Sequence, residues 1–208
     1  MKEIEIKTRL VEFLLEFGDT DAILSSEFRF NFGSRRADLI SLHENMATSY
    51  EIKGASDNTS RLDYQILSYK DYFDYCYVVC EKENLKSIRD ILPRSIGIIV
   101  VYDNFCKAVR KPIQNKNHSK IMLASTLSVE ELKYLTKYKL KLSKYELCLT
   151  LSSQKSLKFI RDTSRKSLLK YSENRFKVFK SEIGNKISSD DILTITRMPS
   201  DKISKFIS

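Results

Sequence analysis

The sequence predicts an α/β fold in which a mixed sheet is flanked by helices and followed by a basic, α-helical C-terminal region. Two observations lead to this prediction. Runs with strand periodicity alternate with runs of helical periodicity as far as residue 113, and leucines at helical spacing dominate the chain after residue 128. A length of 208 residues with 42% hydrophobic side chains is enough for one well-cored domain.

The first quarter of the chain predicts one helix and an antiparallel meander of three strands. Apolar residues recur every three or four positions before Gly18, which ends the helix. Phe28, Phe30 and Phe32 alternate with polar residues, as in a strand with one buried face. Turn residues separate two further strands. The expected elements are a helix at 2–17 and strands at 22–32, 36–42 and 46–53.

The following part alternates helices with strands whose residues are nearly all apolar. Such runs are typical of strands that are covered on both faces. The expected elements are a helix at 61–75, a strand at 75–80, a helix at 83–92, and strands at 95–102 and 105–111. The order αβββαβ is therefore followed by one more helix and two more strands.

A polar stretch separates this part from the remaining helices. The expected division is a core at 1–113, a linker at 114–127 and a basic helical region at 128–208. Ser128 followed by Glu131 has the pattern of a capping box at the start of a helix. Further helices are expected within 129–149 and 154–183, with a last short helix after Ser188.

Positive charge is concentrated in the second half of the chain. Residues 1–100 contain 13 Lys and Arg against 17 Asp and Glu, whereas residues 101–208 contain 23 against 10. A basic region beside an acidic one fits a polyanion that one part holds and the other part acts on chemically. The alternative is a lysine-rich solvated surface without a ligand.

Apolar runs and cysteines indicate the compartment. Every apolar run is shorter than the roughly 20 residues that span a bilayer. The first residues also lack an apolar signal core, so a cytoplasmic protein without a membrane partner is expected. Cys76, Cys80, Cys106 and Cys148 form no C-x-x-C pair, and the chain has two histidines. This pattern predicts that the cysteines are reduced and lie in the core, and that the chain has no structural zinc site.

Two acids and a lysine lie among the apolar residues of two consecutive predicted strands. Asp38 lies in one strand, and Glu51 and Lys53 lie two positions apart in the next. Residues at i and i+2 share a strand face, so Glu51 and Lys53 project together and strand pairing brings Asp38 to them. Buried charges are costly, which favours a purpose such as holding a divalent cation beside a phosphate. The alternative is an exposed ion pair of little energetic consequence.

This arrangement resembles the PD-(D/E)xK nuclease superfamily, which has the restriction-endonuclease-like fold. Asp38 and the E-I-K sequence of the next strand carry the resemblance, with Ala37 at the position of the motif's proline. Gln65 and Tyr69 match the Q-x-x-x-Y element of some members. Over residues 3–110 the chain also resembles a group of small, uncharacterised bacterial PD-(D/E)xK-like proteins.

The resemblance implies a role for each of these residues. The implied metal ligands are Asp38, Glu51, the carbonyl of Ile52 and, from the first helix, Glu5, with Glu12 as the alternative to Glu5. The implied cofactor is Mg²⁺, or Mn²⁺ in its place. The implied catalytic residues are Asp38, Glu51, Lys53 and Gln65, of which Lys53 orients water or neutralises charge on the phosphate. The implied substrate contacts are Arg36, Arg61 and Tyr69, and Glu27 either adds an acid or pairs with Arg36.

The expected function is metal-dependent hydrolysis of phosphodiester bonds in DNA, with the basic helices as a clamp on the DNA backbone. The alternative is a nuclease-like module of phage defence or DNA repair that only binds nucleic acid, or that cuts once a protein partner activates it. The basic helices would then serve that partner. A homodimer is compatible with both. We also expect that removal of the chain after about residue 120 weakens binding more than it alters the chemistry.

Overall fold

Six strands form one mixed sheet in the computed structural model, which describes residues 1–60, 62–137, 141–184 and 186–196. The strands lie side by side in chain order: β1 Ile23–Phe30, β2 Arg35–His43, β3 Met46–Lys53, β4 Tyr75–Glu81, β5 Gly97–Val101 and β6 Cys106–Arg110. The pairs β1–β2, β2–β3 and β5–β6 are antiparallel, whereas β3–β4 and β4–β5 are parallel. The predicted α/β class, with a mixed sheet, is confirmed.

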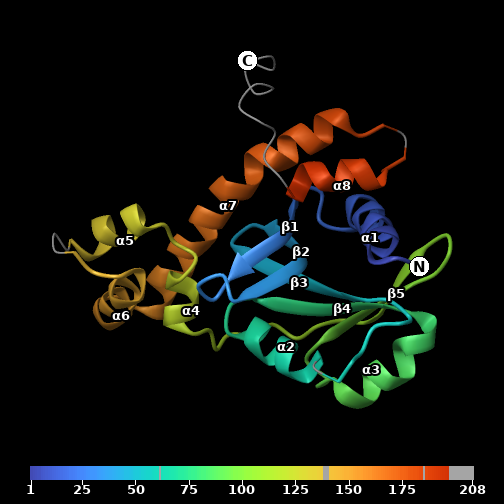
Figure 1. Ribbon diagram of the computed structural model, residues 1–208, viewed down its shortest axis with the longest axis horizontal. Coiled ribbons are helices and arrows are strands. Elements are labelled where there is room, and N and C mark those ends of the chain that lie inside the picture. Colours follow the sequence, from blue (N-terminus) through green and yellow to red (C-terminus); the bar gives the residue numbers. More distant parts are fainter. Residues whose placement is uncertain (61, 138–140, 185, 197–208) are drawn as a thin grey trace.

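Helices cover both faces of this sheet (Figure 1). On one face lie α1 Glu3–Phe17 and α8 Ser189–Thr196, and on the other lie α2 Leu62–Lys70 and α3 Leu85–Ile91, which follows the short 3₁₀ helix η1 Lys82–Asn84. Three helices gather beyond one end of the sheet: α4 Lys120–Ala124, α5 Val129–Thr136 and α6 Lys144–Gln154. The long helix α7 Leu157–Glu182 runs from this group to α8.

Most predicted elements are present, with differences at their ends. The helix expected at 61–75 ends at Lys70 and is followed by a turn, in which the backbone N–H groups of Tyr72 and Phe73 both donate to the carbonyl of Tyr69. The capping box of Ser128 and Glu131 opens α5 as predicted. The stretch 154–183 contains a single helix of 26 residues.

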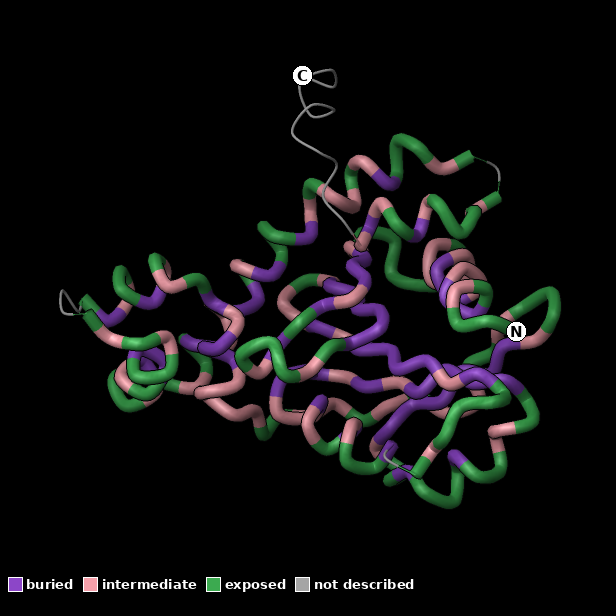
Figure 2. Tube along the Cα trace, in the orientation of Figure 1, coloured by how far each residue is buried: buried purple, intermediate pink, exposed green. Residues whose placement is uncertain are grey.

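Each face of the sheet has its own hydrophobic core. The core under α1 contains Ile6, Leu10 and Val11 of the helix, packed on sheet residues that include Leu39 and Tyr50. The core on the α2 side is larger and holds the aromatic residues Phe28, Phe30, Tyr69, Tyr72 and Phe73. Figure 2 shows the buried chain concentrated along the strands and the inward sides of the helices. The two cores hold α1 and α2 against opposite faces of the sheet, on either side of β3.

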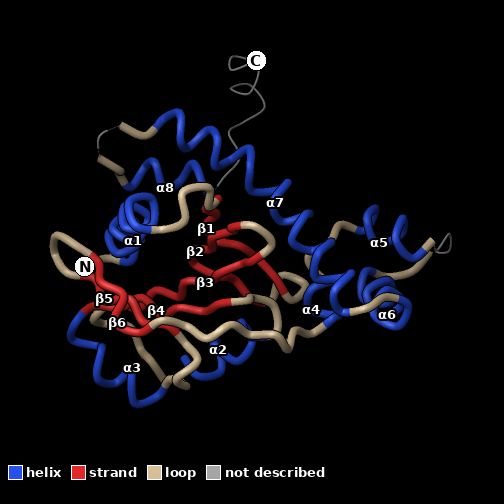
Figure 3. Tube along the Cα trace, turned by 180° about the vertical axis from the view of Figure 1, so that it is seen from behind, coloured by secondary structure: helices blue, strands red, loops and turns tan. Residues whose placement is uncertain are grey.

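The segment expected as a linker, 114–127, packs against the core instead of standing free. The backbone N–H groups of Asn115 and Ser119 donate to the carbonyls of Asp74 and Asp71, and Figure 3 shows this stretch leading from β6 to α4. Leu123 and other residues of this segment and of α5 to α7 are buried in the α2-side core: Ala124, Leu127, Leu132, Leu147, Leu151, Ile160 and Leu168. The C-terminal region therefore shares its cores with the sheet.

Asp74 joins α7 to the sheet through buried ion pairs. The residue is fully buried, and its two carboxylate oxygens accept hydrogen bonds from Arg161 at 2.7 and 2.9 Å and from Arg165 at 3.1 Å. The backbone N–H of Ala47 donates to the same carboxylate at 2.8 Å. Two arginines of α7 are thus paired with one core acid. No helix in the described ranges is both long and apolar enough to cross a membrane.

Candidate active site

The predicted acids meet at a fork between β2 and β3. Pairing between these strands ends at Leu39 and Tyr50, whereas β3 stays paired with β4 as far as Lys53. Beyond the last β2–β3 pair, the carboxylate of Asp38 accepts a hydrogen bond of 2.8 Å from the backbone N–H of Ile52. A side chain of β2 therefore takes the place of a backbone partner for β3.

Asp38 lies in an environment that disfavours its charged form. The residue is 9% exposed and comes directly before the last paired residue of β2, Leu39. Burial, and then repulsion by the carboxylate of Glu51, raise the pKa of Asp38 to about 7, although the hydrogen bond from Ile52 opposes the shift. A positive ion beside Asp38 would remove both penalties at once.

Glu51 is fixed by partners on two sides. Its Oε1 accepts from the ammonium of Lys53 at 2.9 Å, and its Oε2 accepts from the hydroxyl of Tyr69 at 2.6 Å. The same hydroxyl lies 2.7 Å from the carbonyl oxygen of Arg36, so one hydrogen is shared by acceptors on both arms of the fork. Burial and the charge of Glu51 raise the pKa of Tyr69, which keeps its hydroxyl protonated as a donor.

Glu27 lies opposite Asp38 at a point where β1 switches faces. Its φ of 56° is in the left-handed region, which is unusual for a glutamate inside a strand. Leu24, before Glu27, packs under α1, whereas Phe28, after it, packs on the α2 side. The irregular backbone therefore lets β1 contribute to both cores. Strained backbone of this kind often accompanies functional sites.

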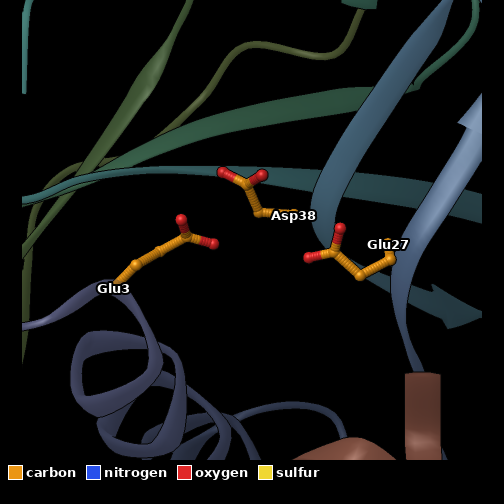
Figure 4. Close-up of side chains that lie close together, drawn as sticks. All are labelled: Glu3, Glu27 and Asp38. Carbon is orange, nitrogen blue, oxygen red and sulfur yellow. The ribbon is translucent and has the colours of Figure 1, made fainter.

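A third acid reaches the same place from α1. Single carboxylate oxygens of Glu3, Glu27 and Asp38 all lie within 4.8 Å of one another, and Figure 4 shows the three carboxylates turned toward a common space. Glu5, the acid expected here, instead accepts a 2.6 Å hydrogen bond from the backbone N–H of Lys2. It belongs to the capping box of α1 and is not one of the three clustered acids.

Cations surround the same acids. The ammonium of Lys7 lies 2.6 Å from Glu27 Oε1 and 3.4 Å from Glu3 Oε1, and Arg36 Nε lies 2.7 Å from Glu27 Oε2. The expected pairing of Glu27 with Arg36 is thus present. Lys7 and Glu3 were not among the residues predicted from the sequence. The position of Lys7 one turn after Glu3, on the face of Leu10 and Val11, is the signal that could have indicated a buried lysine.

The other predicted residues lie around this group. Gln65 is half-buried one turn before Tyr69 on α2, and its side chain makes no hydrogen bond to the described residues. Glu12, the alternative to Glu5, pairs with Arg9 at 3.3 Å. Ile52 lies between Glu51 and Lys53 with its side chain in the α1-side core. Arg61 lies outside the described residues.

A cleft adjoins this site on the side of the C-terminal helices. Its volume is about 540 Å³, and its walls come from β1, from the turn between α4 and α5, and from the helices α5 to α8. Glu27 lies at the cleft, together with Arg29, Lys144 and Tyr171. The guanidinium of Arg175 stacks 4.0 Å from the ring centre of Tyr171. The lining thus combines two acids, Glu27 and Glu131, with the basic residues Arg29 and Lys144 and the aromatic Tyr171.

Comparison with known proteins finds similarity to phage proteins. The model of the family described as Bacteriophage P4 protein cII matches residues 1–196. Protein cII of Enterobacteria phage P4 is 29% identical to the chain over 115 residues, which are 55% of this chain and 43% of that protein. The match thus spans less than half the length of that relative.

One solved structure is also similar. A protein of unknown function from Silicibacter pomeroyi aligns with a TM-score of 0.43 and 11% sequence identity. The alignment covers 84% of this chain and 94% of that one.

Proposed function

The chain belongs to the Bacteriophage P4 protein cII family, and we propose that it hydrolyses phosphodiester bonds in DNA with the help of a divalent cation. The proposal is drawn from the chain's own site. The observation that carries this proposal is the fork of β2 and β3. There Asp38, Glu51 and Lys53 lie together, and the carboxylate of Asp38 occupies the gap in the pairing. The motif resemblance of these three residues to PD-(D/E)xK nucleases supports the same reaction.

The donor set fits a hard cation. Asp38 and Glu51 offer carboxylate oxygens, which Mg²⁺ and Mn²⁺ prefer, and the carbonyl of Ile52 is the proposed third ligand. The raised pKa of Asp38 reflects burial and repulsion by Glu51, both of which a bound cation would offset. When bound, the ion would polarise a phosphate and activate a water molecule as the nucleophile.

The remaining side chains orient these groups. The hydroxyl of Tyr69 lies within hydrogen-bond distance of both Glu51 and the carbonyl of Arg36, so it links β2 and β3 where they no longer pair. The side chain of Lys53 is 12% exposed, and its ammonium can turn from Glu51 toward a phosphate oxygen or a water. Gln65, on the same face of α2 as Tyr69, is the proposed contact for water or phosphate.

The C-terminal helices supply the proposed path for the DNA backbone. The cleft beside Glu27 is lined by Arg29, Lys144 and Tyr171, and α7 exposes lysines along its length, namely Lys158, Lys166, Lys170, Lys177 and Lys180. Lysines next to an acidic site attract a polyanion without competing for the metal ion. The proposed setting is the cytoplasm, where the four cysteines stay free as they are in this structure.

The test is cleavage of linear, circular, single-stranded and branched DNA, and of RNA, with Mg²⁺ or Mn²⁺. The Lys53→Ala variant is expected to lose cleavage of every substrate. The matched control is Lys86→Ala, an exposed lysine on α3, which is expected to cleave like the wild type.

Two results would refute the proposal. Cleavage that persists in Lys53→Ala protein would remove the site assignment. Salt-sensitive DNA binding without cleavage or metal binding would instead identify a nucleic-acid-binding module. Cleavage of RNA alone would retain the chemistry and change the substrate.

A further inference from the structure

Lys7 lies inside the acidic cluster instead of on the solvent face of α1. The residue is 4% exposed, and its ammonium contacts Glu27 and Glu3 at 2.6 and 3.4 Å. Burial of an unpaired ammonium is very costly, so these carboxylates are what stabilises Lys7 in this position. The cluster already contains a cation that belongs to the chain.

Glu27 is engaged on both carboxylate oxygens. Oε1 accepts from Lys7, and Oε2 lies 2.7 Å from Arg36 Nε. A Mg²⁺ ion binds oxygen at about 2.0–2.1 Å, so an ion bound to Glu27 would have to share an oxygen with Lys7 or with Arg36. The two positive charges would also repel each other. Glu27 therefore fits an anchor for Lys7 and Arg36 better than a metal ligand.

Asp38 and Glu51 are engaged differently. One oxygen of Asp38 accepts from the backbone of Ile52, and its other oxygen has no hydrogen-bond partner among the described residues. The cation partner of Glu51 is Lys53, the lysine that the proposed reaction needs free for the phosphate. Asp38 and Glu51 can thus turn to a metal ion without breaking the contacts of Lys7.

We propose that Lys7 is the second cation of this site. Its ammonium takes the place that a second divalent ion occupies in two-metal phosphodiesterases, so that the site binds one divalent cation per chain. Lys7 acts as a positioning residue that holds Glu3 and Glu27 and balances their charge next to Asp38. This inference rests on the proposed function, because it presupposes that Asp38 and Glu51 bind a metal ion.

The test counts the Mn²⁺ ions bound by the full chain, with calorimetry for the number and electron paramagnetic resonance for coupling between ions. The wild type is expected to bind one. The Lys7→Met variant keeps the length of the side chain and removes its charge, so Glu3, Glu27 and Asp38 are expected to bind a second, spin-coupled ion. The double variant Lys7→Met/Glu27→Gln is expected to bind one again, because it lacks a ligand for the second ion.

Each outcome separates this inference from the proposed function. Two ions in the wild type, or one in folded Lys7→Met protein, would overturn the role of Lys7 and leave the metal site in place. No Mn²⁺ in the wild type would refute the proposed function itself. If Lys7→Met does not fold, Glu27→Gln decides, since its amide oxygen still accepts from Lys7. If Glu27→Gln protein still binds one Mn²⁺ ion, the inference is supported. If it binds none, Glu27 is a metal ligand and the inference is overturned.

Discussion

The carboxylate of Asp38 accepts the backbone N–H of Ile52 at 2.8 Å, at the point where β2 and β3 cease to pair. This hydrogen bond stabilises an acid in a gap where burial and Glu51 would otherwise exclude its charge. The charged form of Asp38 therefore lowers the stability of the fold, and replacement of Asp38 should be visible in the pH dependence of unfolding.

We predict that Asp38→Asn stabilises the metal-free protein at pH 8 and has little effect at pH 4. The pKa of Asp38 is about 7 in the folded state against 3.8 for the ordinary group. Between these values the native state binds a proton that the unfolded state lacks, so wild-type stability falls as pH rises from about 4 to 7. The fall amounts to about 4 kcal/mol at most. The amide of the variant cannot titrate, yet its oxygen still accepts from Ile52.

Urea unfolding from pH 4 to 8 in the presence of a chelator measures this difference. Asp90→Asn, at an exposed position of α3, is the control and should follow the wild type. Added Mn²⁺ should raise the midpoint of the wild type and leave Asp38→Asn unchanged. If Asp38→Asn were less stable than the wild type at pH 8, the charged carboxylate of Asp38 would not be destabilising and this prediction would be wrong.

The sequence was sufficient to predict that Glu51 and Lys53 lie together, because a strand has a period of two. Alternation puts Glu51 and Lys53 on one face, and their observed contact of 2.9 Å follows from that rule. Tyr69 could be placed near them because α2 must cover the strands it follows. These are consequences of local periodicity, which one sequence contains.

The choice of acid on α1 could not be made in the same way. Glu3 and Glu5 are both in the first helical turn, and only the tertiary position of the helix decides which one faces Asp38. Glu5 is used in the capping box, whereas Glu3 remains free to reach the cluster. The left-handed backbone of Glu27 also depends on contacts with two cores, which strand alternation alone does not indicate.

We predict that Tyr69→Phe lowers both stability and metal affinity. The change leaves Glu51 Oε2 and the carbonyl of Arg36 without their shared donor, which costs about 1–3 kcal/mol for buried groups. Loss of a partner that orients a metal ligand typically lowers affinity about 10- to 100-fold. Urea unfolding and Mn²⁺ calorimetry measure the two effects.

Tyr72→Phe is the matched control for this variant. Tyr72 is equally buried in the α2-side core, but its hydroxyl contacts Ser164 and Thr126 at 3.2 and 3.4 Å. It should lose some stability and keep the Mn²⁺ affinity of the wild type. Equal losses of affinity in both variants would show that Tyr69 acts through general packing.

We predict that Asp74→Asn destabilises the protein by about 3–5 kcal/mol, because it leaves the buried Arg165 without a counter-charge and weakens the pairing of Arg161. Arg165 is 3% exposed and cannot reach water without moving α7, and Arg161, with a side chain 18% exposed, donates two hydrogen bonds to Asp74. Chemical denaturation measures the loss. Asp162→Asn, in a half-exposed pair with Arg161, is the control and should cost less than about 1 kcal/mol. A small loss in Asp74→Asn would mean that water enters this network.

Truncation near residue 120 cannot separate binding from chemistry, in contrast to the expectation from charge alone. It would remove Leu123, Leu127, Ile160 and Leu168 from the α2-side core together with both arginines that pair with Asp74. Loss of several buried leucines, at about 2–5 kcal/mol each, exceeds the stability of an ordinary domain. The shortened chain is therefore expected to unfold, which circular dichroism would detect.

Charge reversal on the intact chain makes the separation instead. We predict that Lys166→Glu/Lys170→Glu on α7 weakens DNA binding and lowers the slope of log affinity against log salt, since each lost phosphate contact removes about one released counterion. Both side chains are exposed, so folding and Mn²⁺ affinity should not change. Lys82→Glu/Lys86→Glu, on η1 and α3 across the sheet from α7, is the control with the same change in charge (Figure 1). Equal weakening in both double variants would show that net charge attracts the DNA, and that the lysines of α7 form no defined path to Asp38.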